Sequence, residues 1–275
     1  MKPDQRPSSD ERPVTGDNDP ILSLVGVTKR FTTRADDSVL ALDEVQLDIP
    51  RNQFVTIVGP SGCGKSTLLK IISGIIPPSD GAVRFDGKPL VKSSRQIGMV
   101  FQRPVLLPWR SVIGNVLFPI EMLGWDVAKY RDEAMRLVEW IGLGGFERAL
   151  PNELSGGMQQ RVAICRALIY DPQMLMMDEP FGALDAMTRD DLSVELLRIW
   201  TERKKTVVLV THSIPEAVLL ADRVVIMAAR PGRILMDLAV NLPRPRSLAT
   251  ERRVEFQDMV HTIREAIYSQ RKGEG

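Results

Sequence analysis

The spacing of hydrophobic positions changes several times along the chain, and each change marks a different kind of element. Apolar runs of strand length predict buried strands at residues 54–58, 173–178, 206–211 and 223–227. Helical spacing predicts helices at residues 65–73 and 186–203, in alternation with these strands. Because strands that alternate with helices form parallel sheets, the pattern predicts a parallel α/β sheet.

Other stretches depart from this alternation. The period is helical from about residue 103 to 169, which predicts a helical subdomain inserted between strands. Short strands with a turn at Asp86 and Gly87 are expected between residues 82 and 101. Residues 247–270 place apolar side chains at helical spacing, which predicts an amphipathic helix. We expect this helix to pack on the core, and a regulatory or dimer contact is the alternative.

Composition is that of an ordinary globular protein, with 44% apolar and 26% charged residues. The net charge of +1 gives no basis for a nucleic-acid partner, and two cysteines indicate a reducing compartment without a disulfide framework. Residues 1–20 are polar and proline-rich, which predicts a disordered tail without the apolar segment of a secretory signal. No run reaches the roughly 18 apolar residues of a membrane span, so a membrane role is expected only through a partner.

A glycine-rich segment separates the first buried strand from the first helix. Residues 59–66, Gly-Pro-Ser-Gly-Cys-Gly-Lys-Ser, match the phosphate-binding pattern G-x-x-x-x-G-K-[ST]. Its backbone N–H groups can point at phosphate oxygens, and the helix adds its positive end. Lys65 can reach the β- and γ-phosphates, and the Ser66 hydroxyl can bind Mg²⁺. The ATP-binding residues predicted here are Gly59, Pro60, Ser61, Gly62, Cys63, Gly64, Lys65, Ser66 and Thr67.

Two carboxylates end the predicted strand at residues 173–178, at the edge where open α/β sheets bind ligands. Asp178 can hold the Mg²⁺ shell, and Glu179 can accept a proton from an attacking water. His212 follows the strand at residues 206–211, which we expect to lie beside the first. From the residues alone, His212 either contacts the γ-phosphate or serves as a hydrogen-bonded structural histidine.

Residues 154–161, Leu-Ser-Gly-Gly-Met-Gln-Gln-Arg, resemble the LSGGQ signature of the ABC ATPases, with Met158 where glutamine is usual. Ser155 and the two glycines also place donors at a helix start, which makes a second anion site. In the ABC family, the signature of one subunit closes over the ATP held by the other. The resemblance therefore implies a homodimer that uses ATP and Mg²⁺. The signature residues expected to act in trans are Ser155, Gly156, Gly157 and Gln159.

The resemblance covers roughly residues 21–240 and implies a role for several further residues. In chain order these are Phe31 as the aromatic that stacks on adenine, Gln102 as the Q-loop glutamine, Asp178 as the Walker B aspartate, Glu179 as the catalytic glutamate, Asp185 in the D-loop and His212 as the switch histidine. The implied catalytic residues are thus Lys65, Gln102, Glu179 and His212. The implied Mg²⁺ ligands are Ser66, Gln102 and Asp178.

The fold implied by the resemblance is a P-loop NTPase core with a mostly parallel sheet, an antiparallel β subdomain and the inserted helical subdomain. The ATP-binding domain would span residues 21–245 and the C-terminal amphipathic helix residues 246–275. Stretches such as residues 181–189 and 221–233 look like importer subunits of the nitrate/sulfonate/taurine group. Trp109 belongs either to the surface that receives a membrane partner or to a buried anchor of the helical subdomain.

A resemblance to that importer group implies further partners and a location. The chain would bind transmembrane permease subunits at the cytoplasmic face of the inner membrane, and a solute-binding protein would act with it indirectly. The implied function is to energise uptake of a small anion such as a sulfonate, taurine or nitrate. The alternatives are an ABC ATPase that serves another importer or an exporter, a soluble ABC ATPase of DNA repair or translation, and an unrelated P-loop kinase.

Overall fold

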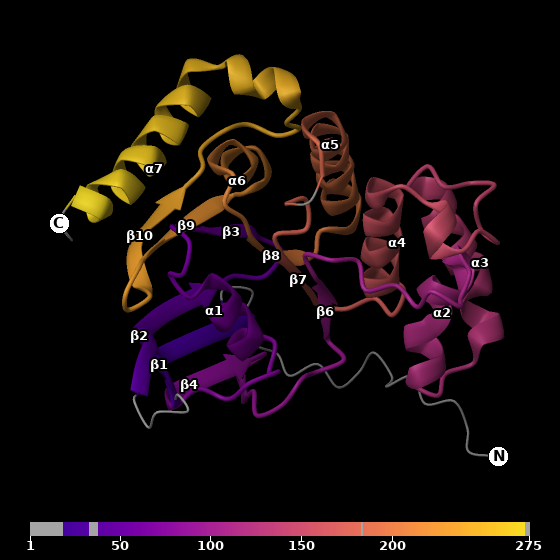
Figure 1. The fold of residues 1–275 in the computed structure, drawn as a ribbon, viewed down its shortest axis with the longest axis horizontal. Helices are drawn as coiled ribbons and strands as arrows, with labels where there is room; N and C mark the ends of the chain where they lie inside the picture. Colours follow the sequence, from indigo (N-terminus) through magenta and orange to yellow (C-terminus); the bar gives the residue numbers. More distant parts are fainter. Residues whose placement is uncertain (1–18, 33–37, 183, 273–275) are drawn as a thin grey trace.

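The computed structural model describes residues 19–32, 38–182 and 184–272, and most of the tail predicted at residues 1–20 lies outside these ranges. Two sheets lie beside each other, and a group of helices stands beyond one edge of the larger sheet (Figure 1). A long helix near the C-terminus runs across the opposite side of the molecule (Figure 1). The described part of the chain therefore has a mixed-sheet body with helices on its flanks.

The larger sheet carries six strands in the order β10-β9-β3-β8-β7-β6. The parallel strands are β3 (Phe54–Val58), β6 (Ile97–Val100), β7 (Met174–Asp178), β8 (Thr206–Val210) and β9 (Arg223–Ala228), and β10 (Arg233–Ala239) is antiparallel to β9. Every residue of β3 and β8 is buried, as expected where helices cover both faces of a parallel sheet. The predicted parallel α/β sheet is confirmed.

The smaller sheet is antiparallel and has the order β2-β1-β4-β5. Its strands are β1 (Leu22–Thr32), β2 (Ser38–Ile49), β4 (Asp80–Phe85) and β5 (Lys88–Pro89). Helix α1 (Lys65–Ile72) joins the two sheets, because Leu68 and Leu69 share one buried cluster with Leu22 of β1 and Val55 of β3. This packing fixes the loop before α1 between the two sheets.

The helical insert lies between β6 and β7. It contains α2 (Val112–Met122), α3 (Val127–Trp140), the short 3₁₀ helix η1 (Pro151–Glu153) and α4 (Gly156–Leu168). Residues 101–111 form a loop, so the first helix begins nine residues later than the helical period suggested. Helix α2 starts where Ser111 caps it by accepting from the Gly114 N–H, and Pro104 and Pro108 disfavour a helix in the loop before it.

Two helices flank the strands that follow the insert, and two more elements close the described chain. These are α5 (Ala186–Arg203), α6 (Ile214–Leu220), the 3₁₀ helix η2 (Leu248–Arg252) and α7 (Val254–Lys272). Helix α7 buries Phe256, Val260 and Ile263 in the main core cluster, so it packs on the core as expected. It begins at Val254, because residues 248–252 form the 3₁₀ turn instead. No helix among the described residues is long and apolar enough to cross a membrane.

Candidate functional site

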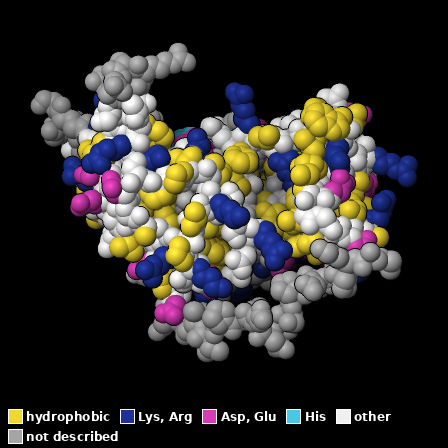
Figure 2. All heavy atoms as spheres, turned by 90° about the horizontal axis from the view of Figure 1, so that it is seen from below, with side chains coloured by type: hydrophobic (Ala, Val, Ile, Leu, Met, Phe, Trp, Pro, Cys, Tyr) yellow, Lys and Arg dark blue, Asp and Glu magenta, His cyan; other side chains and the backbone are white. Residues whose placement is uncertain are grey.

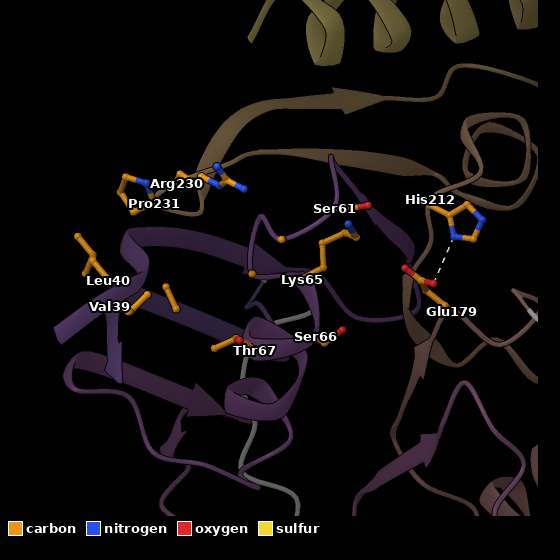
Figure 3. A pocket seen from close by; sticks show the side chains of 13 residues that line it. Val39, Leu40, Ser61, Lys65, Ser66, Thr67, Glu179, His212, Arg230 and Pro231 are labelled. Atoms are coloured by element: carbon orange, nitrogen blue, oxygen red, sulfur yellow. Dashed lines mark hydrogen bonds and ion pairs between the residues drawn. The ribbon is translucent and has the colours of Figure 1, made fainter. Parts of the chain in front are cut away.

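A cavity of about 1040 Å³ opens where the loop before α1 meets the carboxyl ends of β7 and β8. Figure 3 shows Glu179 and His212 at one end and Arg230 at the other, with Lys65 between them. The lining consists of Val39, Leu40, Ala41, Ser61, Gly62, Gly64, Lys65, Ser66, Thr67, Glu179, His212, Arg230 and Pro231. The fold thus brings the phosphate loop, Glu179 and His212 into one site.

The loop between β3 and α1 can hold phosphate because its backbone bends in a way that few residues allow. Gly64 caps α1 with a φ of 89°, and a Cβ there would lie 2.9 Å from the Ala41 carbonyl oxygen. Lys65 is buried, and its Nζ donates to the carbonyl oxygens of Gly59 (2.8 Å) and Pro60 (3.0 Å). The ammonium group is therefore held inside the loop that it would share with a nucleotide.

Cys63 lies in the same loop with its side chain buried. Burial raises the pKa of its thiol, although Lys65 Nζ lies 3.7 Å from its Sγ atom and opposes this shift. A buried thiol with a raised pKa is poorly reactive, so the side chain fits a packing role.

Two of the residues predicted to bind Mg²⁺, Ser66 and Asp178, contact each other, and the third, Gln102, contacts the adjacent Glu179. The Ser66 hydroxyl donates to Asp178 Oδ1 over 3.2 Å, which joins the start of α1 to the end of β7. Burial raises the pKa of Asp178, and a cation bound beside the carboxyl group would oppose this shift by favouring its ionised form. Mg²⁺ prefers oxygen ligands and is often held by one or two carboxylates together with substrate phosphates. The Ser66 hydroxyl and the Asp178 carboxylate fit that preference, and so does the amide oxygen of Gln102, whose side chain contacts Glu179.

Glu179 has a strained backbone and a defined set of partners. Its φ is 44°, in the left-handed region that non-glycine residues rarely adopt, and its N–H donates to the Val210 carbonyl oxygen over 2.8 Å. Its Oε2 atom accepts from Gln102 Nε2 (3.3 Å) and lies 3.2 Å from His212 Nδ1 (Figure 3). Because β7 pairs with β8 through Asp178 and Val210, Glu179 and His212 leave neighbouring strands side by side.

The predicted signature does not line this cavity. Ser155 caps α4, and its Oγ atom accepts from the Met158 N–H over 3.2 Å. A Cβ on Gly157 would lie 2.5 Å from Thr188 Cγ2, so α4 packs tightly against the start of α5. Gln159 points back along its own chain and donates to the Pro151 carbonyl oxygen over 2.8 Å. Within one copy, the signature therefore lies apart from the phosphate loop.

Gly59, Pro60, Cys63, Gln102 and Asp178 adjoin residues of the cavity without lining it, and Phe31 and Asp185 also lie outside the lining. Phe31 is 42% exposed, with Lys29 Nζ 5.2 Å from its ring centroid, and its register partner Val39 lines the cavity instead. Asp185 caps α5, where its Oδ1 atom accepts from the Thr188 N–H over 3.0 Å. This hydrogen bond and a second one, from the Thr188 hydroxyl to Asp185 Oδ2 (2.7 Å), lower the pKa of Asp185.

Sequence reasoning gave no role to the residues that line the end of the cavity opposite Glu179. Val39 and Leu40 lie near the start of β2, while Arg230 and Pro231 lie in the turn between β9 and β10. Gly232 fixes this turn against the phosphate loop, since a Cβ there would lie 2.2 Å from the Cys63 carbonyl oxygen. Residues 230 and 231 lie in the stretch that resembles the importer group, but that resemblance gave them no part in ATP binding, so only the packing reveals it.

The loop between β6 and α2 presents Trp109 outward with 73% of its surface exposed, which rules out the buried-anchor interpretation. Buried Asn115 holds the loop, because its side chain accepts from the Leu107 N–H (2.7 Å) and donates to the Leu107 (3.1 Å) and Arg110 (2.9 Å) carbonyl oxygens. Val105 and Met122 are also largely exposed. Figure 2 shows hydrophobic side chains interleaved with lysines and arginines on the lower face of the molecule.

The parallel sheet, the phosphate loop at its carboxyl edge and the adjoining carboxylates define a P-loop nucleoside triphosphatase. A family model described as ABC transporter matches residues 42–182. The dimeric ATP-binding cassette MJ0796, solved with ADP and Pi in a post-hydrolysis state, superposes with a TM-score of 0.71 and 33% identity. That likeness covers 81% of this chain and 100% of the cassette.

Curated relatives agree over most of the chain. An uncharacterized ABC transporter ATP-binding protein of Methanocaldococcus jannaschii is 47% identical, over 88% of this chain and 90% of the relative. The aliphatic sulfonates import ATP-binding protein SsuB of Bacillus cereus is 44% identical, over 86% of this chain and 92% of the relative. The taurine import ATP-binding protein TauB of Jannaschia sp. is also 44% identical, over 78% of this chain and 80% of the relative. The chain belongs to the ABC transporter family and is an ATP-binding ATPase, which confirms the predicted family and fold.

Proposed function

We propose that this chain hydrolyses ATP as a homodimer, with each ATP held between the phosphate loop of one copy and the signature of the other. The observation that carries the proposal is that Ser155 lies at an exposed helix start outside the cavity lined by Lys65 and Glu179. A helix N-terminus with free donors attracts phosphate, and within one copy no nucleotide in the cavity would use it. The dimeric relative solved with ADP and Pi supports this arrangement.

Within that site, Glu179 acts as the general base for the attacking water. Gln102 and His212 both contact its Oε2 atom, so they fix the direction of the carboxylate, and His212 is placed to meet the γ-phosphate as charge moves. Lys65 neutralises phosphate charge from inside the loop. Ser66, Asp178 and Gln102 would hold Mg²⁺, which supplies further charge neutralisation at the phosphates when it is bound. The Arg230 end of the cavity would receive the base and ribose.

Mixing two inactive variants tests the shared site. In a Lys65→Ala and Ser155→Arg mixture, the heterodimer has one site with both defects and one intact site. Random assembly makes about half of the dimers mixed, so we expect about one quarter of wild-type ATPase activity to return. The matched control mixes Lys65→Ala with Glu179→Gln, whose defects lie on the same side of each site. This control should recover nothing. Equal activity in the two mixtures would refute a shared site.

We further propose that the chain is the cytoplasmic ATPase subunit of a bacterial importer and lies at the inner membrane through permease subunits. The rigid loop that exposes Trp109 supports a partner surface there, because Asn115 holds that loop in place. Co-purification with the permease should be lost in Trp109→Ala, while the ATPase activity of the isolated chain stays normal. Retention of the permease by Trp109→Ala would contradict this surface.

The transported solute is proposed to be a small sulfonate, with taurine among the candidates and nitrate as the other anion to test. This proposal is supported by two relatives, each 44% identical to this chain, which are named as aliphatic sulfonate and taurine import proteins. A solute-binding protein would supply selectivity outside this chain. A gene deletion should abolish growth on a sulfonate as sole sulfur source, with rescue by the wild type but not by Glu179→Gln. Loss of growth on nitrate alone would instead assign nitrate import.

A further inference from the structure

Glu216 and Arg189, on neighbouring helices, each carry a buried polar atom without a hydrogen-bond partner among the described residues. Glu216 lies in the first turn of α6 and is 7% exposed, and its Oε1 atom has no partner. Arg189 lies in the first turn of α5, and its buried Nε atom has no partner either. Helices α5 and α6 contact each other, and the Arg189 guanidinium opposes the burial that raises the pKa of Glu216 to about 7. A guanidinium donor, Arg189 Nε, and a carboxyl acceptor, Glu216 Oε1, therefore both lack a hydrogen-bond partner among the described residues.

Arg189 is tied to the turn that precedes α5. Its Nη2 atom donates to the Leu184 carbonyl oxygen over 3.1 Å, and its N–H donates to the Asp185 carbonyl oxygen over 3.0 Å. Asp185 in turn caps α5 through Thr188. A displacement of the turn at Leu184 and Asp185 would therefore move the Arg189 side chain.

Glu216 is tied to the residues on both sides of His212. Its Oε2 atom accepts from the Thr211 hydroxyl over 3.2 Å, and the Thr211 Oγ1 atom accepts from the Ser213 N–H over 3.0 Å. His212 lies between them and contacts Glu179 Oε2 at 3.2 Å through its Nδ1 atom. The position of the Glu216 carboxyl group is thus transmitted to the histidine by two hydrogen bonds.

A purely structural role for Glu216 would be that of a capping box, in which a glutamate at the third helix position binds the N-cap N–H. The sequence Ser213-Ile-Pro-Glu216 matches that pattern, and Ser213 Oγ does accept from the Glu216 N–H over 3.4 Å. The return bond is missing, because the Ser213 N–H donates to Thr211 instead. The Glu216 carboxyl is therefore not engaged by the helix start, and its Oε1 atom stays available.

We propose that Arg189 and Glu216 are positioning residues that link the turn at Leu184 and Asp185 to the loop of His212. When a second copy packs on that turn, Arg189 Nε donates to Glu216 Oε1, and the ion pair fixes the histidine for hydrolysis. Buried polar groups that lack a partner cost free energy, and pairing removes both costs at once. The inference rests on the proposed dimer, since the second copy supplies the displacement.

A double-mutant cycle on ATPase kinetics tests the link, with Glu216→Gln, Arg189→Met and the double variant. Glu216→Gln keeps an acceptor for Thr211 and removes the ion pair. We expect each single change to lower kcat about tenfold with KM for ATP within about twofold, and the double variant to be no worse than either. Arg198→Met, on the exposed side of the same helix, is the matched control and should keep its kcat.

Losses that multiply to about a hundredfold in the double variant, or single variants with normal kcat, would overturn the link. If Arg189→Met lowers the melting temperature strongly, Arg189→Lys replaces it in the cycle, because lysine keeps the charge but lacks the Nε donor. The mixing experiment with Lys65→Ala and Ser155→Arg is run in parallel. If ATPase activity returns in that mixture but the two single losses simply multiply in the double variant, only the Arg189–Glu216 link is refuted. If no activity returns in the mixture, the shared site itself is refuted.

Discussion

Arg246 is a buried cation outside the ATP site whose removal should cost the fold much of its stability. It is 5% exposed, and its guanidinium donates to five backbone carbonyl oxygens. Nη1 reaches Val218 (3.1 Å), Leu219 (3.3 Å) and Ala221 (2.5 Å), and Nη2 reaches Val240 (3.2 Å) and Leu242 (3.0 Å). The first three close the C-terminal end of α6, the helix that follows His212. Burial lowers the pKa of Arg246 to about 10, so the side chain remains charged at neutral pH.

Arg246→Met keeps the apolar stem and deletes the charge. Each hydrogen bond is worth about 1 kcal/mol net, and the removal of a buried cation returns part of its desolvation cost, so we expect a loss of about 3–5 kcal/mol. At about 2 °C per kcal/mol for a chain of this size, the melting temperature should fall by about 6–10 °C. Urea unfolding followed by circular dichroism measures the free energy directly.

Arg253→Met is the matched control, because Arg253 is exposed in the same C-terminal segment. Its free energy of unfolding should stay within about 0.5 kcal/mol of the wild type. A loss below about 1 kcal/mol for Arg246→Met would show that water or rearranged backbone replaces the guanidinium, and the reasoning from buried carbonyl groups would fail.

Three further predictions follow from the site. Because burial raises the pKa of Glu216 to about 7, the folded chain loses stability as pH rises from about 4.5 through 7. The Glu216→Gln variant should therefore melt at a higher temperature than the wild type at pH 8, but not at pH 5. Arg230→Ala should raise KM for ATP about three- to tenfold with kcat unchanged, whereas exposed Arg233→Ala should leave both unchanged. Gly157→Ala should lower the free energy of unfolding by about 1–3 kcal/mol. Adding Thr188→Ser should restore part of this loss, because it removes the clashing methyl group, and no rescue would contradict this packing.

The sequence by itself determined the local chemistry. The glycine pattern before Lys65 sets a backbone path that can hold phosphate, and a buried strand followed by Asp178 and Glu179 puts two carboxylates at a sheet edge. Such features depend on residues that are neighbours in the chain. For that reason the parallel sheet, the helical insert and the C-terminal helix could also be predicted, with errors mainly at helix starts.

Only the tertiary structure decided which of these pieces share a cavity and which way their side chains point. It left the exposed Phe31 outside the lining and brought in Arg230, to which the sequence gave no part in ATP binding. It also placed Ser155 apart from Lys65 and packed α5, which carries Arg189, against α6, which carries Glu216. Hydrophobic spacing fixes the buried face of each element, but neighbours across a sheet or between helices depend on how the buried faces pack together.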